Sequence, residues 1–72
     1  MIPLYDCKAN PDKELTISWI AIKYQKIVAP WIHLQDTIRV IQNQKDMILK
    51  TKTGSTLAIN EELAQHIGIQ EN

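Results

Sequence analysis

The alternation of apolar and polar residues between positions 37 and 60 is the feature that most constrains the fold. The stretch reads TIRVIQNQKDMILKTKTGSTLAIN, and residues that favour turns interrupt the alternation twice. Successive side chains of a strand point to opposite faces, so this period of two predicts strands and the interruptions predict hairpin turns. The stretch therefore predicts a small antiparallel β-meander of three strands over about residues 37–60.

The first turn is predicted at Asn43-Gln44. Asparagine tolerates the positive φ that two-residue hairpin loops require at their first position. This loop would pair Val40 with Met47 and keep both on one face of the sheet.

The second turn is predicted around the glycine at position 54. A two-residue loop would place Lys50 and Lys52 on the same face as apolar residues of the third strand, which burial disfavours. A three-residue loop over residues 53–55 avoids this conflict and would pair Leu49 with Ile59.

These registers divide the meander into two faces. The predicted inner face is apolar and consists of Ile38, Val40, Met47, Leu49, Leu57 and Ile59. The predicted outer face mixes basic and apolar side chains and consists of Arg39, Ile41, Ile48, Lys50, Lys52 and Ala58.

A short C-terminal helix is predicted over about residues 60–67. Asn60 is a good N-cap, and Glu61 and Glu62 place negative charge at the positive end of the helix. Gly68 would supply the left-handed residue that ends the helix, with Ile69 folding back on it. We expect no further strand after this helix.

The N-terminal segment, residues 1–30, is predicted to be β-rich, with a helix over residues 11–29 as the alternative. Residues 10–13 (NPDK) can form a type I turn before a strand, or Asn10 can cap a helix whose first residue is Pro11. Ile20 and Ile22 can face outward on such a strand. The whole chain, residues 1–72, is predicted to be a single α+β domain in which this segment completes the sheet or covers it.

The charge and composition of the chain indicate whether it spans a membrane and in which compartment it functions. The formal net charge is zero, although residues 15–52 hold six basic residues against two acidic ones. The apolar stretch 15–34 is interrupted by Lys23 and Lys26, so it is predicted to be core rather than a membrane span. Cys7 is the only cysteine, and a lone thiol suits a reducing compartment, so we expect a cytoplasmic protein without a targeting segment.

No arrangement of residues predicts catalysis or cofactor binding. His33 and His66 do not have the spacing of metal ligands, and the two glycines exclude a glycine-rich phosphate loop. Cys7, whose pKa Lys8 can lower, would need a distant base to act as a nucleophile. We therefore predict no enzyme, no metal, no cofactor and no small-molecule substrate.

The outer face of the meander is the candidate functional surface. A sheet that is apolar on both faces needs a second cover, which a partner can supply. The predicted partner-binding residues are Arg39, Ile41, Ile48, Lys50 and Lys52. They favour a small regulator, adaptor or inhibitor that binds another protein and forms a homodimer, without a membrane partner.

The alternative is a transcriptional regulator that binds nucleic acid through the basic hairpin 37–60. Its lysines could hold phosphates, and Trp19 and Trp31 could stack on bases if exposed. In a small domain, however, tryptophans more often fill the core.

Two local resemblances accompany these patterns. Residues 32–67 resemble part of a LytTR-type DNA-binding domain, with a strand, a hairpin and a short helix. Residues 54–69 are similar to the strand–helix step of AbrB-type swapped hairpins, which continue with a further strand. Both rest on hydrophobic spacing, so they transfer no functional residues and assign the chain to no family.

Overall fold

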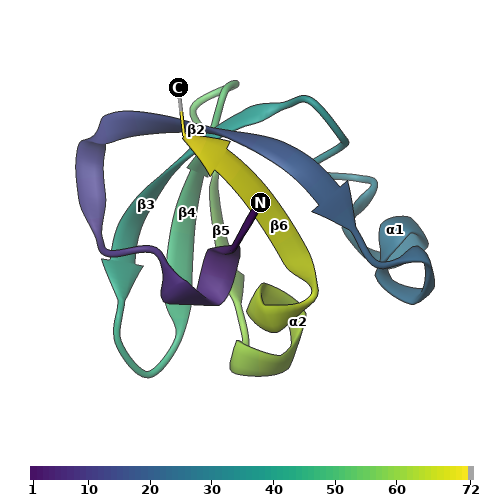
Figure 1. Cartoon of the computed structure of the whole chain (residues 1–72). Helices are drawn as coiled ribbons and strands as arrows, with labels where there is room; N and C mark the ends of the chain where they lie inside the picture. The colour runs from purple at the N-terminus through teal and green to yellow at the C-terminus, as the bar shows by residue number, and fades with distance from the viewer. Residues whose placement is uncertain (72) are drawn as a thin grey trace.

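The computed structural model describes residues 1–71 and contains one six-stranded antiparallel sheet (Figure 1). Along the chain the elements are β1 (Ile2–Pro3), η1 (Leu4–Asp6), β2 (Asn10–Ile20), α1 (Ile22–Val28), β3 (Thr37–Asn43), β4 (Met47–Thr51), β5 (Thr56–Ile59), α2 (Glu61–Gln65) and β6 (Ile67–Glu71). The strand order is β1-β6-β2-β3-β4-β5, so the last strand lies between two strands of the N-terminal segment. The predicted α+β class, with a meander and a short helix, is confirmed.

The meander formed by β3, β4 and β5 has the predicted faces but shifted registers. Val40 pairs with Leu49 rather than Met47, and Ile59 pairs with Met47 rather than Leu49. Both shifts are two residues long, so every side chain stays on its predicted face. The turns accordingly lie at residues 44–46 and 52–54 instead of 43–44 and 53–55.

Gly54 ends the second turn in a left-handed conformation, with φ of 89°. Its N–H donates to the carbonyl of Thr51 at 2.9 Å, and the N–H of Thr51 donates to the carbonyl of Ser55 at 2.8 Å. A tight turn followed by a left-handed residue is the usual geometry of a three-residue hairpin loop. The odd loop length was therefore predicted correctly, although its position was one residue too late.

The N-terminal segment combines the two predicted alternatives in sequence. It forms a strand up to Ile20 and a helix from Ile22, so neither a continuous strand nor a helix over residues 11–29 is present. The predicted turn at residues 10–13 (NPDK) is absent, because these residues belong to β2. The strand is irregular here, because the register of β2 against β3 shifts between Asn10 and Leu15.

A bulge at Ser18 reverses the alternation near the end of β2. Ile17 pairs with Ile69 and Trp19 with Gly68, so β2 contains one extra residue at this point. An extra residue changes which face the following side chains occupy. Trp19 is therefore exposed and Ile20 is buried, and the prediction that Ile20 faces outward was wrong.

The end of the chain differs most from the prediction. α2 begins at the predicted cap, where Asn60 Oδ1 accepts a hydrogen bond from the N–H of Leu63 at 2.8 Å. It ends at Gln65, and Gly68 is not left-handed but lies inside β6. The predicted glycine stop and the absence of a following strand were therefore wrong.

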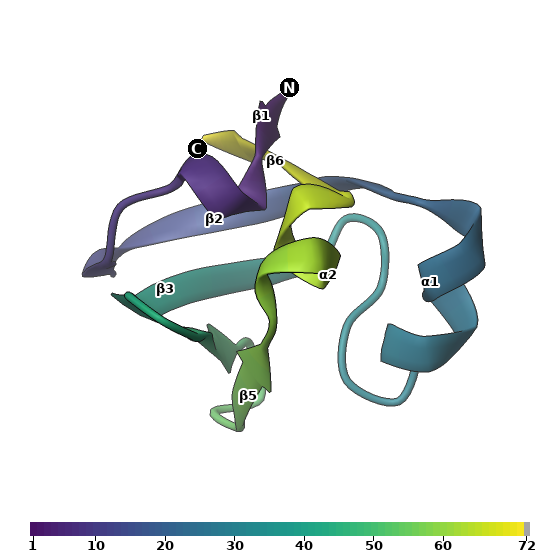
Figure 2. The same cartoon turned by 90° about the horizontal axis from the view of Figure 1, so that it is seen from below.

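The core lies between the inner face of the sheet and the two short elements η1 and α2, which pack against each other (Figure 2). Leu4 of η1 and Ala64 of α2 are fully buried. All the predicted inner-face residues of β3, β4 and β5 belong to this core or pack against it. The sheet is thus covered on one face, and its other face is left for the candidate site.

Candidate interaction surface

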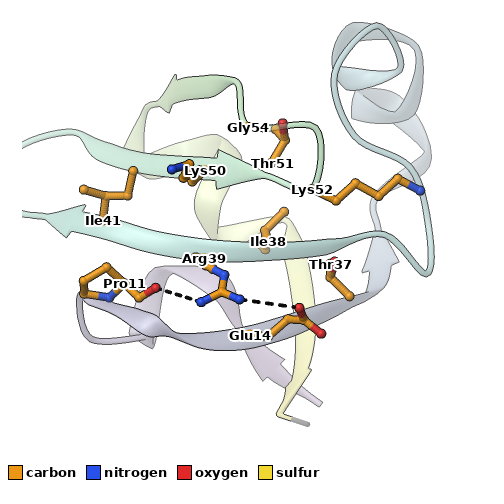
Figure 3. A pocket seen from close by; sticks show the side chains of 10 residues that line it. All are labelled: Pro11, Glu14, Thr37, Ile38, Arg39, Ile41, Lys50, Thr51, Lys52 and Gly54. Atoms are coloured by element: carbon orange, nitrogen blue, oxygen red, sulfur yellow. Dashed lines mark hydrogen bonds and ion pairs between the residues drawn. The ribbon is translucent and has the colours of Figure 1, made fainter.

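A groove of about 440 Å³ runs over the outer face of the sheet, across β2, β3 and β4 (Figure 3). It is lined by Pro11, Glu14, Thr37, Ile38, Arg39, Ile41, Lys50, Thr51, Lys52 and Gly54. Four of the five predicted partner-binding residues are among them, and we call this surface the outer groove. Ile48 is only partly buried but does not line the groove.

Arg39 is held at one wall of the outer groove by β2. Its guanidinium donates to the carbonyl oxygen of Pro11 at 3.1 Å, and it lies 3.8 Å from a carboxylate oxygen of Glu14. The irregularity of β2 between Asn10 and Leu15 brings these acceptors over the face of the sheet (Figure 3). The positive charge of Arg39 is therefore partly neutralised within the chain.

Lys52 is paired in the same way at the other end of the groove. Its Nζ lies 3.1 Å from Oδ1 of Asp36, and Oδ2 of the same carboxylate accepts a hydrogen bond from the N–H of His33 at 2.9 Å. Burial alone would raise the pKa of Asp36. The hydrogen bonds from Lys52 and His33 outweigh it, so the pKa of this carboxyl lies below its usual value. Asp36 is therefore ionised at neutral pH and holds Lys52 in place.

Lys50 differs from the other two cations. It lies directly opposite Arg39 in the β3–β4 ladder, and it is exposed. Within residues 1–71 it forms no ion pair or side-chain hydrogen bond. It is therefore the cation of the groove that is available to a carboxylate from outside.

Ile41 supplies an apolar side chain beside Lys50. Val40 pairs with Leu49 and Gln42 pairs with Ile48, so Ile41 is the extra residue of a bulge in β3. The two residues of a bulge oppose a single residue of the neighbouring strand. Ile41 remains 38% exposed at the groove, where it offers an apolar contact.

Sequence reasoning missed the acidic residues that pair with the cations of the outer groove. Glu14 is far from the hairpin in the sequence and reaches Arg39 because β2 pairs with β3. Asp36 directly precedes β3 and reaches Lys52 across the β3–β4 ladder. No local sequence pattern predicts the contact between Glu14 and Arg39. The charge of Asp36 beside a predicted strand was the only available signal.

The tryptophans were also placed wrongly by the sequence. Trp19 is 41% and Trp31 51% exposed, so neither fills the core. Isoleucine, leucine and valine side chains fill it instead. Trp19 lies near the end of β2 and Trp31 follows α1, and neither residue lines the outer groove.

The remaining candidate residues form no chemical site in the described part of the chain. Cys7 is buried, and its Sγ donates to the carbonyl of Pro3 at 3.7 Å. Burial raises the pKa of this thiol, and Glu71 and Asp6 raise it further, contrary to the lowering expected from Lys8. Across residues 1–71, no group of three histidine, cysteine or acidic side chains is placed to hold a metal ion. No helix within these residues has the length and apolarity needed to cross a bilayer.

Comparisons with known proteins establish the fold. The crystal structure of the iron uptake regulatory protein FeoA matches this structure with a TM-score of 0.80, over 99% of this chain and 96% of that chain, at 20% sequence identity. No family model and no curated protein sequence matches the chain. The agreement over nearly the whole of both chains shows that this chain adopts the SH3-like fold of FeoA.

Proposed function

We propose that the chain is a small non-enzymatic regulatory module that acts by binding another protein at the outer groove. The observation that carries this proposal is the composition of the groove, in which exposed Ile41 lies among charges that are mostly paired. Surfaces that combine an apolar contact with neutralised charges are typical of protein recognition. The likeness to FeoA, which is described as an iron uptake regulatory protein, supports a regulatory role.

The partner segment can be described by the groove that receives it. It would place an apolar side chain on Ile41 and a carboxylate near Lys50, the groove cation without an internal acid. Arg39 and Lys52 are held by Glu14 and Asp36, so they would shape the walls rather than attract the partner. Fixed walls reduce the ordering that binding requires.

The same surface would serve a homodimer, as the sequence predicts. In a two-fold dimer the groove of one copy faces the groove of the other. Ile41 would then be covered by its own counterpart. Buried Cys7 without a disulfide partner suits the reducing conditions of the cytoplasm, where we place this module.

Site-specific photo-crosslinking tests the proposal. A photoreactive amino acid replaces Ile41 in one variant and Lys45, in the turn between β3 and β4, in the control. We expect cells irradiated with the Ile41 variant to yield a discrete adduct of one mass, identified by mass spectrometry as one protein or as a second copy of this chain. The adduct should disappear when Lys50→Glu is added. Equal labelling from both positions, or none from Ile41, would exclude the groove as a partner site.

The second candidate is nucleic-acid binding by the hairpin of β3 and β4, and unpaired Lys50 favours it. The pairing of Arg39 and Lys52 with acids weighs against it, because phosphate binding depends on available cations. Fluorescence anisotropy of labelled duplex and single-stranded oligonucleotides at low and high salt separates the two. Salt-dependent binding weakened by Lys50→Ala would support this candidate, and no binding at low salt would reject it.

A further inference from the structure

The helix α1 and its two flanking segments carry exposed apolar side chains that lie outside the outer groove. Five of the nine large apolar side chains exposed in the described residues belong to it. They are Trp19, Ile22, Ile27, Trp31 and Leu34. We call this surface the α1 end, and Figures 1 and 2 show α1 projecting beyond the sheet.

The outward face of α1 combines isoleucine and lysine. Val28 is the only buried residue of the helix, and Tyr24, one turn earlier, is partly buried on the same side. At 100° per residue, Ile22, Lys26, Lys23 and Ile27 follow one another around the opposite side. All four are exposed, and Ile22 has 86% of its surface accessible.

The charge of the α1 end has one sign. Residues 15–35 contain Lys23, Lys26 and His33 but neither aspartate nor glutamate. Neither lysine forms an ion pair within residues 1–71, although Lys23 Nζ lies 5.1 Å from the centre of the Tyr24 ring. Asp36 pairs with Lys52 and lies 3.6 Å from His33 Nδ1. Burial, and then a hydrogen bond with Glu62, raise the pKa of Tyr24.

The aromatic residues are suited to a boundary between water and hydrocarbon. Trp19 and Trp31 are each about half exposed, on opposite sides of α1 in the chain. An indole ring presents an apolar body and one polar N–H, which is why tryptophan is enriched at membrane interfaces. Lysine side chains beside such rings can lay their methylene stems on apolar surface and keep their charge in water.

We propose that the α1 end docks on an anionic lipid surface. Exposed isoleucine and tryptophan would enter the boundary between headgroups and acyl chains, and Lys23 and Lys26 would face the lipid phosphates. The projection of α1 beyond the sheet favours this occupant, because a convex element reaches a flat surface without displacing other parts of the chain. The proposal departs from the expectation of no membrane partner, which rested on the zero net charge of the whole chain and on the absence of a predicted span.

Vesicle co-sedimentation tests the proposal with the unmodified chain. One set of vesicles is pure phosphatidylcholine, and the other is phosphatidylcholine and phosphatidylglycerol in equal parts. We expect binding to the second set, together with a blue shift of the tryptophan emission, since both tryptophans lie at the α1 end. Lys23→Gln with Lys26→Gln should weaken binding roughly 25-fold, because each lysine near an anionic surface contributes about fivefold.

Matched variants distinguish docking through the α1 end from nonspecific electrostatic or hydrophobic adsorption to the vesicles. Lys8→Gln with Lys45→Gln removes the same charge from exposed positions outside both the α1 end and the outer groove, and should leave the affinity within about twofold. Ile22→Ser should weaken binding at least tenfold, whereas Ile2→Ser, at an exposed isoleucine outside both surfaces, should not. Circular dichroism verifies that each variant is folded.

Three results would overturn the proposal. They are no binding to either vesicle set, equal binding to both sets, and equal losses for the two lysine pairs. In the first case the α1 end would be left for an acidic, apolar segment of a protein. Failure here does not affect the outer groove, because the crosslinking experiment probes a different surface.

Discussion

Lys52 and Asp36 form an ion pair, with 3.1 Å between Nζ and Oδ1, that joins the β4–β5 turn to the loop after α1. The two residues lie at the point where the outer groove approaches the α1 end. Asp36 also ends its loop by accepting the N–H of His33. One carboxylate thus orders parts of both candidate surfaces.

Asp36→Asn should lower the free energy of unfolding by about 1 kcal/mol at pH 7, since it weakens one partly exposed ion pair and one hydrogen bond. The pKa of Asp36 in the folded chain is lowered, so its stabilisation is fully present above the unfolded value of about 3.9. It is lost as the pH falls through the lowered pKa. Urea unfolding of both proteins between pH 7 and pH 2 should therefore show curves that converge in acid. A difference that persists at the lowest pH would contradict the role of the ionised carboxylate.

Gly54→Ala should destabilise the chain by about 1–2 kcal/mol, because an L-residue at φ of 89° is strained. Space is not the cause, since nothing lies within 4 Å of a Cβ built at this position. Gly54→Asn should cost less, because asparagine tolerates the left-handed region better. Thermal unfolding of the two variants measures the difference, and equal losses would point to a cause other than φ.

Asn60→Ala should cost about 1 kcal/mol of stability by removing the cap that accepts the N–H of Leu63. Asn60→Asp keeps an acceptor at the same position and is the matched control. Chemical denaturation compares the three proteins. Similar stability of Asn60→Ala and the unmodified chain would show that α2 does not depend on its cap.

Ile69→Val should lower the free energy of unfolding by about 0.5–1.5 kcal/mol, because Ile69 is fully buried in β6. Ile22→Val makes the same chemical change at an exposed position and should shift stability by less than about 0.5 kcal/mol. Denaturant midpoints of the pair give the contrast. Equal effects would mean that Ile69 of β6 is not part of the packed core.

The meander could be predicted from the sequence because the residues that specify its strands and turns are close together in the chain. Alternation identified the inner face, and the odd loop at Gly54 followed from the requirement that Lys50 and Lys52 stay out of the core. The exact registers could not be obtained in this way. Shifts of two residues leave the alternation unchanged, so only the lengths of the turns and the bulge at Ile41 decide between them.

The candidate site was predicted in part for the same reason. Alternate residues of a strand lie on the same face of a sheet, which is why one face was predicted for Arg39, Ile41, Lys50 and Lys52. The structure places all four along one groove. The partner of Arg39, Glu14, comes from β2 and depends on which strand pairs with β3, whereas Asp36 lies next to β3 and meets Lys52 across the predicted hairpin.

The sequence by itself determined the three strands of the meander, their buried face and the start of α2 at Asn60. Tertiary structure alone decided that residues 67–71 continue as a strand instead of ending a helix. Main-chain groups of this segment find partners in β1 and β2, which are remote in the chain, and pairing with them overrides the local preference of glycine for a turn. The bulge at Ser18 has the same origin, and it is what turns Trp19 outward and Ile20 into the core.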